Sequence, residues 1–244
     1  MKKFFSSLIF LSLLIVFIGS GLLLFQSVEE EHQYHHMEEQ IEEEKQIVVE
    51  EDYEFEELVE NNEINDDTIG WITIAGTSID YPIVQARDNC YYLTHACNGD
   101  ESKYGSIFMD CRNAADFSDK HTILYGHNMK NGSMFHDLNE YDSHVYLDEH
   151  TYIKIYSQDV YRKWAIFSTY STEPDFNYLQ TEFDSPKEYS SFLNSLLSHS
   201  EFNDLKVQVT NEDKILTLST CSDDLEQGRR VVHDKLVEEV IEDE

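Results

Sequence analysis

The chain has 244 residues and a formal net charge of −32 at pH 7, from 49 Asp and Glu against 17 Lys and Arg. This length suits one sizeable domain with accessory segments, and 9 Gly with 3 Pro exclude a collagen-like or low-complexity chain. The negative charge repels phosphates, so we expect no nucleic-acid partner; it indicates a solubilising surface or, as the alternative, attraction of a cationic partner.

The first predicted element is an apolar helix. Residues 4–25 carry no charged side chain, Lys2 and Lys3 precede them, and glutamates follow. At a rise of about 1.5 Å per residue, such a helix is about 30 Å long and can cross a bilayer. The basic end is expected in the cytoplasm. A cleaved signal peptide is the competing interpretation, but its apolar region is usually shorter and ends in an A-x-A-like site. We predict a cytoplasmic tail at 1–3 and an uncleaved, single-pass signal anchor at 4–25.

Residues 26–63 are strongly acidic, with apolar residues at loosely helical spacing, and predict a charged, partly helical stalk. Three histidines lie at i, i+3 and i+4 in this stalk, namely His32, His35 and His36. This spacing could hold a metal ion, but exposed histidines in a charged segment usually bind none. No loop has the pattern of a calcium site either. We therefore expect no metal and no cofactor.

Residues 64–244 are predicted to form the catalytic domain, which is mainly β. Alternating apolar and polar residues with Gly and Asn or Asp punctuation predict many strands. Strands are expected within 69–85 and at 106–109, 122–125, 152–156, 161–169, 206–209, 215–219 and 231–237. Helices are expected at 132–141 and 186–198, the second capped by Ser185. Many strands with few helices predict a closed or nearly closed β-barrel with helices at its side.

One cysteine stands where a predicted strand ends. Cys221 follows the alternating run Ile215–Thr220, has polar neighbours, and precedes a polar loop and two arginines. A buried structural cysteine is the ordinary alternative. A thiol with an ordinary pKa of about 8.5 is mostly protonated at neutral pH, and a nearby cation stabilises the nucleophilic thiolate. A nucleophilic cysteine also needs a proton donor for the leaving group, normally a histidine.

Among the 11 histidines, His127 is the best candidate for that donor. It follows the predicted strand 122–125 and a glycine, and a titratable group at a strand end faces solvent or a cleft. His121 lies at the opposite end of that strand, and His136 lies in the following predicted helix.

The other cysteines are Cys90, Cys97 and Cys111, and no CxxC pattern occurs. Cys90 and Cys97 could form a disulfide, although sequence alone does not show it. Four cysteines in a chain of this length do not make a disulfide scaffold, so at least one free thiol is expected.

Taken together, these segments resemble the sortase family of cysteine transpeptidases, and class B sortases most closely. The resemblance rests on TLSTC followed by RRVV with LYGHN upstream, and on GWITIAGTSIDYPIVQ, NCYYLTH, KYGSIFMDCRN, HTILYGHNMKNGSMF and NYLQTEFDSPKEYSSFLNSLL in the expected order. It spans about residues 60–240 and implies an eight-stranded β-barrel, a membrane anchor and an extracytoplasmic site.

The resemblance also implies a catalytic constellation of Cys221, His127 and Arg229. Arg229 takes the arginine position because Lys235 follows six residues later, as in the family's pattern. Arg230 is the alternative, but successive strand residues face opposite sides, so only one arginine should reach the thiol. A surface ion pair of Arg229 with the acidic loop that precedes it is the structural alternative.

By family position, a set of further residues is expected to line the substrate groove. They are Asn89, Leu93, Tyr178, Leu179, Ser219 and Thr220. Each is also a plausible fold residue. Pro174 departs from the pattern, because some class members carry a substrate-contacting threonine at about this position, so we expect the preferred sorting motif to differ from theirs.

The implied function is a membrane-anchored transpeptidase. It cleaves a sorting motif of secreted proteins through a thioacyl intermediate and transfers them to a cell-wall peptide amine. Two alternatives stay open: a pilin polymerase, which uses a pilin lysine as acceptor, and a non-enzymatic acidic surface-binding module.

Overall fold

The computed structural model describes residues 66–157, 160–173, 175–221 and 228–241. The predicted tail, signal anchor and stalk lie outside this part of the chain. Within it, no helix is long and apolar enough to cross a membrane.

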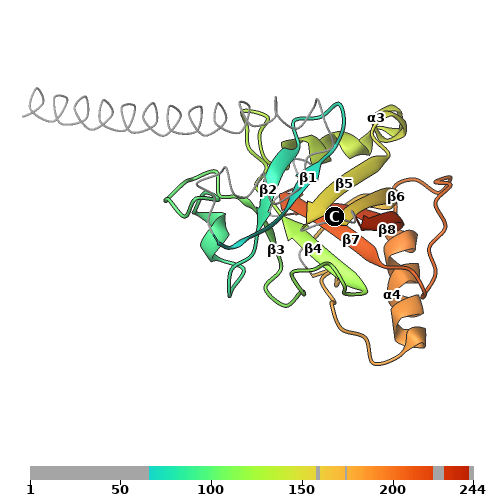
Figure 1. Ribbon diagram of the computed structural model, residues 1–244. Coiled ribbons are helices and arrows are strands. Elements are labelled where there is room, and N and C mark those ends of the chain that lie inside the picture. Colours follow the sequence, from blue (N-terminus) through green and yellow to red (C-terminus); the bar gives the residue numbers. More distant parts are fainter. Residues whose placement is uncertain (1–65, 158–159, 174, 222–227, 242–244) are drawn as a thin grey trace, which may run out of the picture. The chain divides into compact units, whose positions relative to one another are not determined.

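Eight strands form a closed barrel, as the alternating sequence predicts (Figure 1). The strands are β1 (Thr68–Thr73), β2 (Asp80–Val84), β3 (Ile107–Met109), β4 (His121–Tyr125), β5 (Tyr152–Ser157), β6 (Val160–Thr172), β7 (Ile215–Cys221) and β8 (Arg229–Ile241). Their order around the barrel is β1-β2-β3-β4-β7-β8-β6-β5. The β2–β3 and β4–β7 pairs are parallel, and the other pairs are antiparallel.

The helix α4 (Pro186–His199) covers the outer face of the barrel beside β6 (Figure 1). Ser185 caps it by accepting a hydrogen bond from the Glu188 amide, and Pro186 opens it, as predicted. Its apolar stripe packs against outward-facing strand residues in a cluster that includes Phe167, Tyr170, Tyr178, Tyr189, Phe192, Leu193, Leu196, Ile215 and Val231. The barrel therefore has a second layer on this side.

The helix predicted at 132–141 is shifted. The chain instead forms the short 3₁₀ helix η2 (His136–Asp142) and then α3 (His144–Glu149). Gly132 and Met134 have φ angles of 91° and 58°, and a positive φ is incompatible with a right-handed helix. The turn that they make delays the start of the helix.

The strand predicted at 206–209 is wrong, because this segment has no ladder partner among the described residues. The alternation of its side chains is real: Val207 and Val209 pack against the α4 cluster. However, β7 already pairs with β4 and β8, so the closed barrel leaves no edge beside it for another strand. The alternating pattern at 206–209 therefore indicates that one side of the segment is buried, but not that the segment pairs with another strand.

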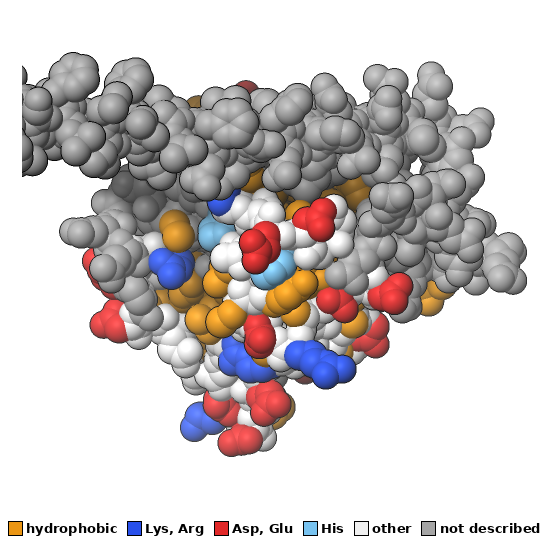
Figure 2. Space-filling view, turned by 90° about the vertical axis from the view of Figure 1, so that its left-hand side faces the viewer, with side chains coloured by type: hydrophobic (Ala, Val, Ile, Leu, Met, Phe, Trp, Pro, Cys, Tyr) orange, Lys and Arg blue, Asp and Glu red, His pale blue; other side chains and the backbone are white. Residues whose placement is uncertain are grey.

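The surface that Figure 2 shows carries acidic, basic and apolar side chains interspersed, with histidines among them. No patch of a single sign covers the described part of this face.

Candidate active site

The last residue of β7 and the first residue of β8 face each other. Cys221 and Arg229 are Cα partners in this antiparallel pair. Directly opposite residues project to the same face, with their Cβ atoms about 4.5–5.5 Å apart. The thiol is exposed, and Arg229 is half-buried. A thiol accessible to a substrate therefore has a guanidinium as its cross-strand neighbour.

Arg230 occupies the opposite face, as strand parity predicts. It pairs with Thr220, and its side chain is fully buried. Its Nη1 atom donates to both carboxylate oxygens of Glu201, at 2.9 and 2.8 Å. The structure thus places Arg229 beside the thiol and commits Arg230 to an ion pair elsewhere. The acidic residues that could pair with Arg229, at 223–226, lie outside the described residues.

The third strand end brings His127 to the same place. β4 runs parallel to β7 with Tyr125 beside Ser219, and the Gly126 amide continues the ladder by donating to the Ser219 carbonyl at 3.3 Å. His127 follows Tyr125 by two residues, as Cys221 follows Ser219, and the next residue, Asn128, donates to the Cys221 carbonyl. The ends of three adjacent strands, β4, β7 and β8, therefore carry the imidazole, the thiol and the guanidinium.

The orientation of the His127 ring follows from one hydrogen bond. Its Nε2 atom lies 2.7 Å from the carbonyl oxygen of Leu93 in η1 (Tyr91–Leu93). A carbonyl only accepts, so Nε2 carries the hydrogen, and in the neutral ring Nδ1 is then the acceptor. The histidine can therefore take up a proton at Nδ1 without breaking its support.

Two further residues at this site were missed by the sequence reasoning. Asn128 donates from Nδ2 to the Cys221 carbonyl at 3.1 Å, and its Oδ1 lies 2.8 Å from Nδ1 of His136. Gly105, at a φ of 60°, lies so close that a Cβ there would stand 3.1 Å from the His127 ring and 2.5 Å from the Tyr92 carbonyl. The signal for Asn128 was its place directly after His127 in LYGHN.

Tyr178 closes one side of the site. Its hydroxyl lies 2.9 Å from Oγ of Ser219, which shares a face of β7 with Cys221. Burial raises the pKa of Tyr178, whereas the Ser219 hydrogen bond and the positive charge of Arg229 act to lower it. This buried hydroxyl is therefore protonated at neutral pH and lies within electrostatic range of Arg229.

The remaining predicted groove residues are dispersed around these. The Leu179 carbonyl accepts from Nη2 of Arg112 at 3.0 Å, and Oδ1 of Asn89 accepts from the Cys111 amide at 2.7 Å. Leu93 is exposed through its side chain. Thr220 differs, because it points to the inner face with Arg230 and is 2% exposed. It remains a candidate for substrate contact only through its backbone.

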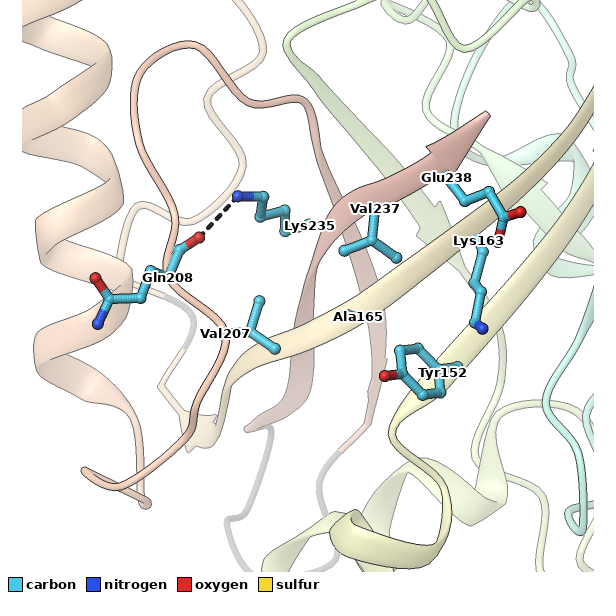
Figure 3. Close-up of a pocket in the computed structure, with 8 residues that line it drawn as sticks. All are labelled: Tyr152, Lys163, Ala165, Val207, Gln208, Lys235, Val237 and Glu238. Carbon is cyan, nitrogen blue, oxygen red and sulfur yellow. Dashed lines mark hydrogen bonds between the residues drawn. The ribbon is translucent and has the colours of Figure 1, made fainter. Parts of the chain in front are cut away.

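A hollow of about 370 Å³ lies elsewhere, on the outside of β5, β6 and β8 (Figure 3). Lys235 lines it and donates to the Gln208 carbonyl at 2.9 Å, and it also pairs with Asp213 at 3.1 Å. Lys235 lies six residues after Arg229 on β8, which is about 20 Å at the rise of a strand. Lys235, whose spacing identified Arg229 in the sequence, therefore holds the loop before β7.

All four cysteines are free thiols, including Cys90 and Cys97. Over the described ranges, no group of His, Cys, Asp and Glu side chains could hold a metal ion.

This barrel, with a thiol, an imidazole and a guanidinium at adjacent strand ends, defines a class of protein. The sortase domain family matches residues 72–237, and the chain belongs to the sortase family of cysteine transpeptidases. Within that family it is similar to class B enzymes. Sortase B of Listeria monocytogenes is 42% identical over 184 residues, which are 75% of this chain and 74% of that protein.

Sortase B of Staphylococcus aureus is 36% identical over 170 residues, which are 70% of this chain and 68% of that protein. A structure of a Staphylococcus aureus sortase B–substrate complex superposes with a TM-score of 0.78 at 30% identity, covering 86% of this chain and 98% of that one. The structure of sortase B from Listeria monocytogenes gives 0.67 at 41% identity, covering 73% and 99%.

Proposed function

We propose that this transpeptidase cleaves a C-terminal sorting motif of secreted proteins and joins the cleaved protein to a peptide amine of the cell wall. The observation that carries the proposal is the convergence of Cys221, His127 and Arg229 at the ends of three adjacent strands. The solved complex of the Staphylococcus aureus relative with its substrate supports substrate binding at this site.

In the first half-reaction, the Cys221 thiolate attacks the carbonyl carbon of a threonine in the motif. The carbonyl oxygen gains negative charge, and Arg229 donates hydrogen bonds to it or to the neighbouring substrate backbone. As the C–N bond breaks, the imidazolium form of His127 gives a proton to the departing amine. A thioester on Cys221 remains, and His127 is neutral.

In the second half-reaction, the acceptor amine attacks the thioester carbon. His127 takes the amine's proton, the C–S bond breaks, and a new peptide bond forms while the thiolate and the imidazolium are restored. The Leu93 carbonyl keeps the ring in one orientation through both transfers, because it holds the Nε2 hydrogen. Water competes with the amine for the same thioester, so the outcome depends on which nucleophile arrives first.

The segment at 4–25 is proposed to anchor the enzyme in the membrane, with the catalytic domain on the outer side. Its length without charge and the preceding lysines support this orientation. The test is membrane fractionation of the full chain and of a chain that lacks residues 4–25. Equal release of both chains to the soluble fraction would contradict the anchor.

The central experiment uses the full chain in detergent with a library of fluorogenic peptides and a short peptide amine as acceptor. Cys221→Ala is expected to abolish cleavage and amine transfer while thermal unfolding stays unchanged, because the thiol is exposed. Cys111→Ala, at another exposed thiol, is the matched control and should keep full turnover. Unchanged turnover in Cys221→Ala would defeat the proposal. Acceptors that carry a stem-peptide amine or a pilin-type lysine separate wall attachment from polymerisation.

A further inference from the structure

A buried chain of hydrogen bonds crosses four neighbouring strands on the face that carries Cys221. Nε2 of His121 on β4 lies 2.6 Å from Oγ1 of Thr217 on β7, which lies 2.7 Å from Nδ1 of His233 on β8. Nε2 of His233 lies 2.7 Å from the hydroxyl of Tyr170 on β6. All four side chains are at most 1% exposed. The proposed chemistry uses none of them.

The donor and the acceptor of each hydrogen bond in this series follow from the contact at its His121 end. Nδ1 of His121 lies 2.7 Å from the carbonyl oxygen of Gln180, which only accepts, so this nitrogen carries the hydrogen. In the neutral ring Nε2 then accepts from the Thr217 hydroxyl. Thr217 in turn accepts from Nδ1 of His233, and Tyr170 donates to Nε2 of His233. Each donor thus has one acceptor, and the chain ends on Gln180.

Gln180 belongs to a segment without helix or strand between β6 and α4. We call residues 176–183 the wall segment, because Tyr178 and Leu179 lie in it. Its contacts with the barrel are polar as well as apolar: the Gln180 carbonyl accepts from His121, the Leu179 carbonyl accepts from Arg112, and the Tyr178 hydroxyl meets Ser219. With no backbone ladder of its own, this segment depends on such side-chain bonds for its position.

We propose that His121 is a positioning residue for the transpeptidation site. Its hydrogen bond to Gln180 holds the wall segment against the barrel, which keeps Tyr178 beside Ser219 and shapes the groove next to Cys221. The inference rests on the proposed function for its effect on substrate, but its structural half can be measured without turnover.

The surroundings of His121 keep its ring neutral, as this positioning role requires. Thr217 and His233 face the ring from β7 and β8, and the Phe192 ring from α4 packs at 5.3 Å. The pKa of His121 is lowered to about 4, chiefly by burial; Arg112 acts in the same direction, whereas the hydrogen bond to the Gln180 carbonyl and the charges of Asp110 and Asp119 act to raise it. The ring is therefore neutral at physiological pH and able to donate from Nδ1 while it accepts at Nε2.

The decisive comparison uses two variants of one residue and a control in the same chain of hydrogen bonds. His121→Leu removes the donor to Gln180, whereas His121→Asn places its amide where Nδ1 was and restores it. His233→Leu is the control, because His233 bonds Thr217 and Tyr170 in the same buried network, and none of its hydrogen bonds among the described residues goes to the wall segment. The ring contact of Tyr170 with Phe176 is kept in this variant. All three are made in the full chain.

Two readouts need no substrate: amide hydrogen exchange of residues 176–183, and the alkylation rate of Cys221 by iodoacetamide, each followed by mass spectrometry. We expect His121→Leu to raise exchange in the wall segment about tenfold or more and to change the alkylation rate, whereas His121→Asn and His233→Leu stay near wild type. Equal effects of His121→Leu and His233→Leu, or none from His121→Leu, would overturn the proposal.

The kinetic readout uses the best peptide of the library. His121→Leu should raise KM about tenfold with kcat changed less than about threefold, and His121→Asn should return KM toward wild type. If His121→Leu does not fold, His121→Gln replaces it, because the longer amide reaches Thr217 and leaves Gln180 without a donor. A KM for His121→Gln equal to that of His121→Asn then overturns the proposal. If no peptide is cleaved by any variant, the proposed function fails, and hydrogen exchange still decides the positioning role.

Discussion

The two faces of β7 and β8 differ in how completely their polar groups are hydrogen-bonded. On the outer face, Thr217 and Ser219 have partners, and Cys221 is open to solvent. On the inner face, the hydroxyl of Thr220 and both carboxylate oxygens of Asp234 have no hydrogen-bond partner within the described residues. One pair of strands therefore carries the catalytic groups on one side and incompletely hydrogen-bonded polar groups on the other.

The second layer explains the difference. On the outer face, the wall segment and α4 bring backbone carbonyls and ring atoms to the strand side chains. On the inner face of the described strands, only Arg230 receives such a partner, because Glu201, which follows α4, reaches its guanidinium. The buried Tyr141 of η2 lies within electrostatic range of Asp234, but neither Asp234 nor the hydroxyl of Thr220 has a hydrogen-bond partner within the described residues. Buried polar groups without a partner are costly.

The largest expected effect is the loss of activity on replacing Arg229, the arginine on the outer face. Arg229→Ala is expected to lower kcat/KM about 10²- to 10³-fold, as for loss of a group that stabilises developing charge, because Arg229 faces the thiol. Thermal unfolding should hardly change. Arg229→Lys should restore little, because an ammonium lacks the planar fork. Steady-state kinetics and calorimetry measure both, and full activity in Arg229→Ala would remove this arginine from the mechanism.

Breaking the ion pair of Arg230, on the inner face, should have the opposite result: stability falls and activity is kept. Glu201→Ala leaves the guanidinium of Arg230, which is fully buried, without its counter-charge. The free energy of unfolding should fall by about 3 kcal/mol, at the low end for such pairs because Glu201 is 35% exposed. Activity per folded molecule should persist. Denaturant unfolding with an active-site titration checks this, and a loss of activity without a loss of stability would contradict it.

The next effect is a loss of stability in mild acid. Burial lowers the pKa of His121 to about 4, and burial and His121 together lower that of His233. Below about pH 6.5 the unfolded chain binds protons on these rings that the folded chain does not, so the free energy of unfolding falls as pH falls. His121 alone accounts for about 2 kcal/mol between pH 7 and pH 5. His121→Asn should flatten this slope, and an unchanged slope would contradict it.

The smallest effect concerns the interior carboxyl. Burial raises the pKa of Asp234 well above its ordinary value, so the contribution of Asp234 to stability is most favourable below about pH 4 and becomes less favourable as pH rises toward the folded pKa. Asp234→Asn cannot ionise and should be more stable than wild type by about 1 kcal/mol at pH 7, with the gain vanishing near pH 4. Urea unfolding at both values tests this, and an equal change at the two pH values would refute it.

Most strands of the barrel and the start of α4 could be predicted, because they depend on local sequence patterns. Alternation of apolar side chains located the barrel strands, and Ser185 with Pro186 marked the start of α4. Alternation failed at 206–209, where Val207 and Val209 are covered by other side chains with no strand to pair with. A pattern of period two reports which side is buried, but it does not say that a partner strand is available.

The amino-acid sequence by itself determined the class of the fold, the position of a thiol at a strand end, and the parity that separates Arg229 from Arg230. These features depend on the periodicity of neighbouring residues, which can be seen in the sequence itself. The tertiary structure alone decided the hydrogen bond that orients the His127 ring toward Leu93, the hydrogen bond from Asn128 to Cys221, and the link from His121 to Gln180. These contacts join residues far apart in sequence, and only the register between β4 and β7 and the docking of the wall segment bring them within hydrogen-bonding distance.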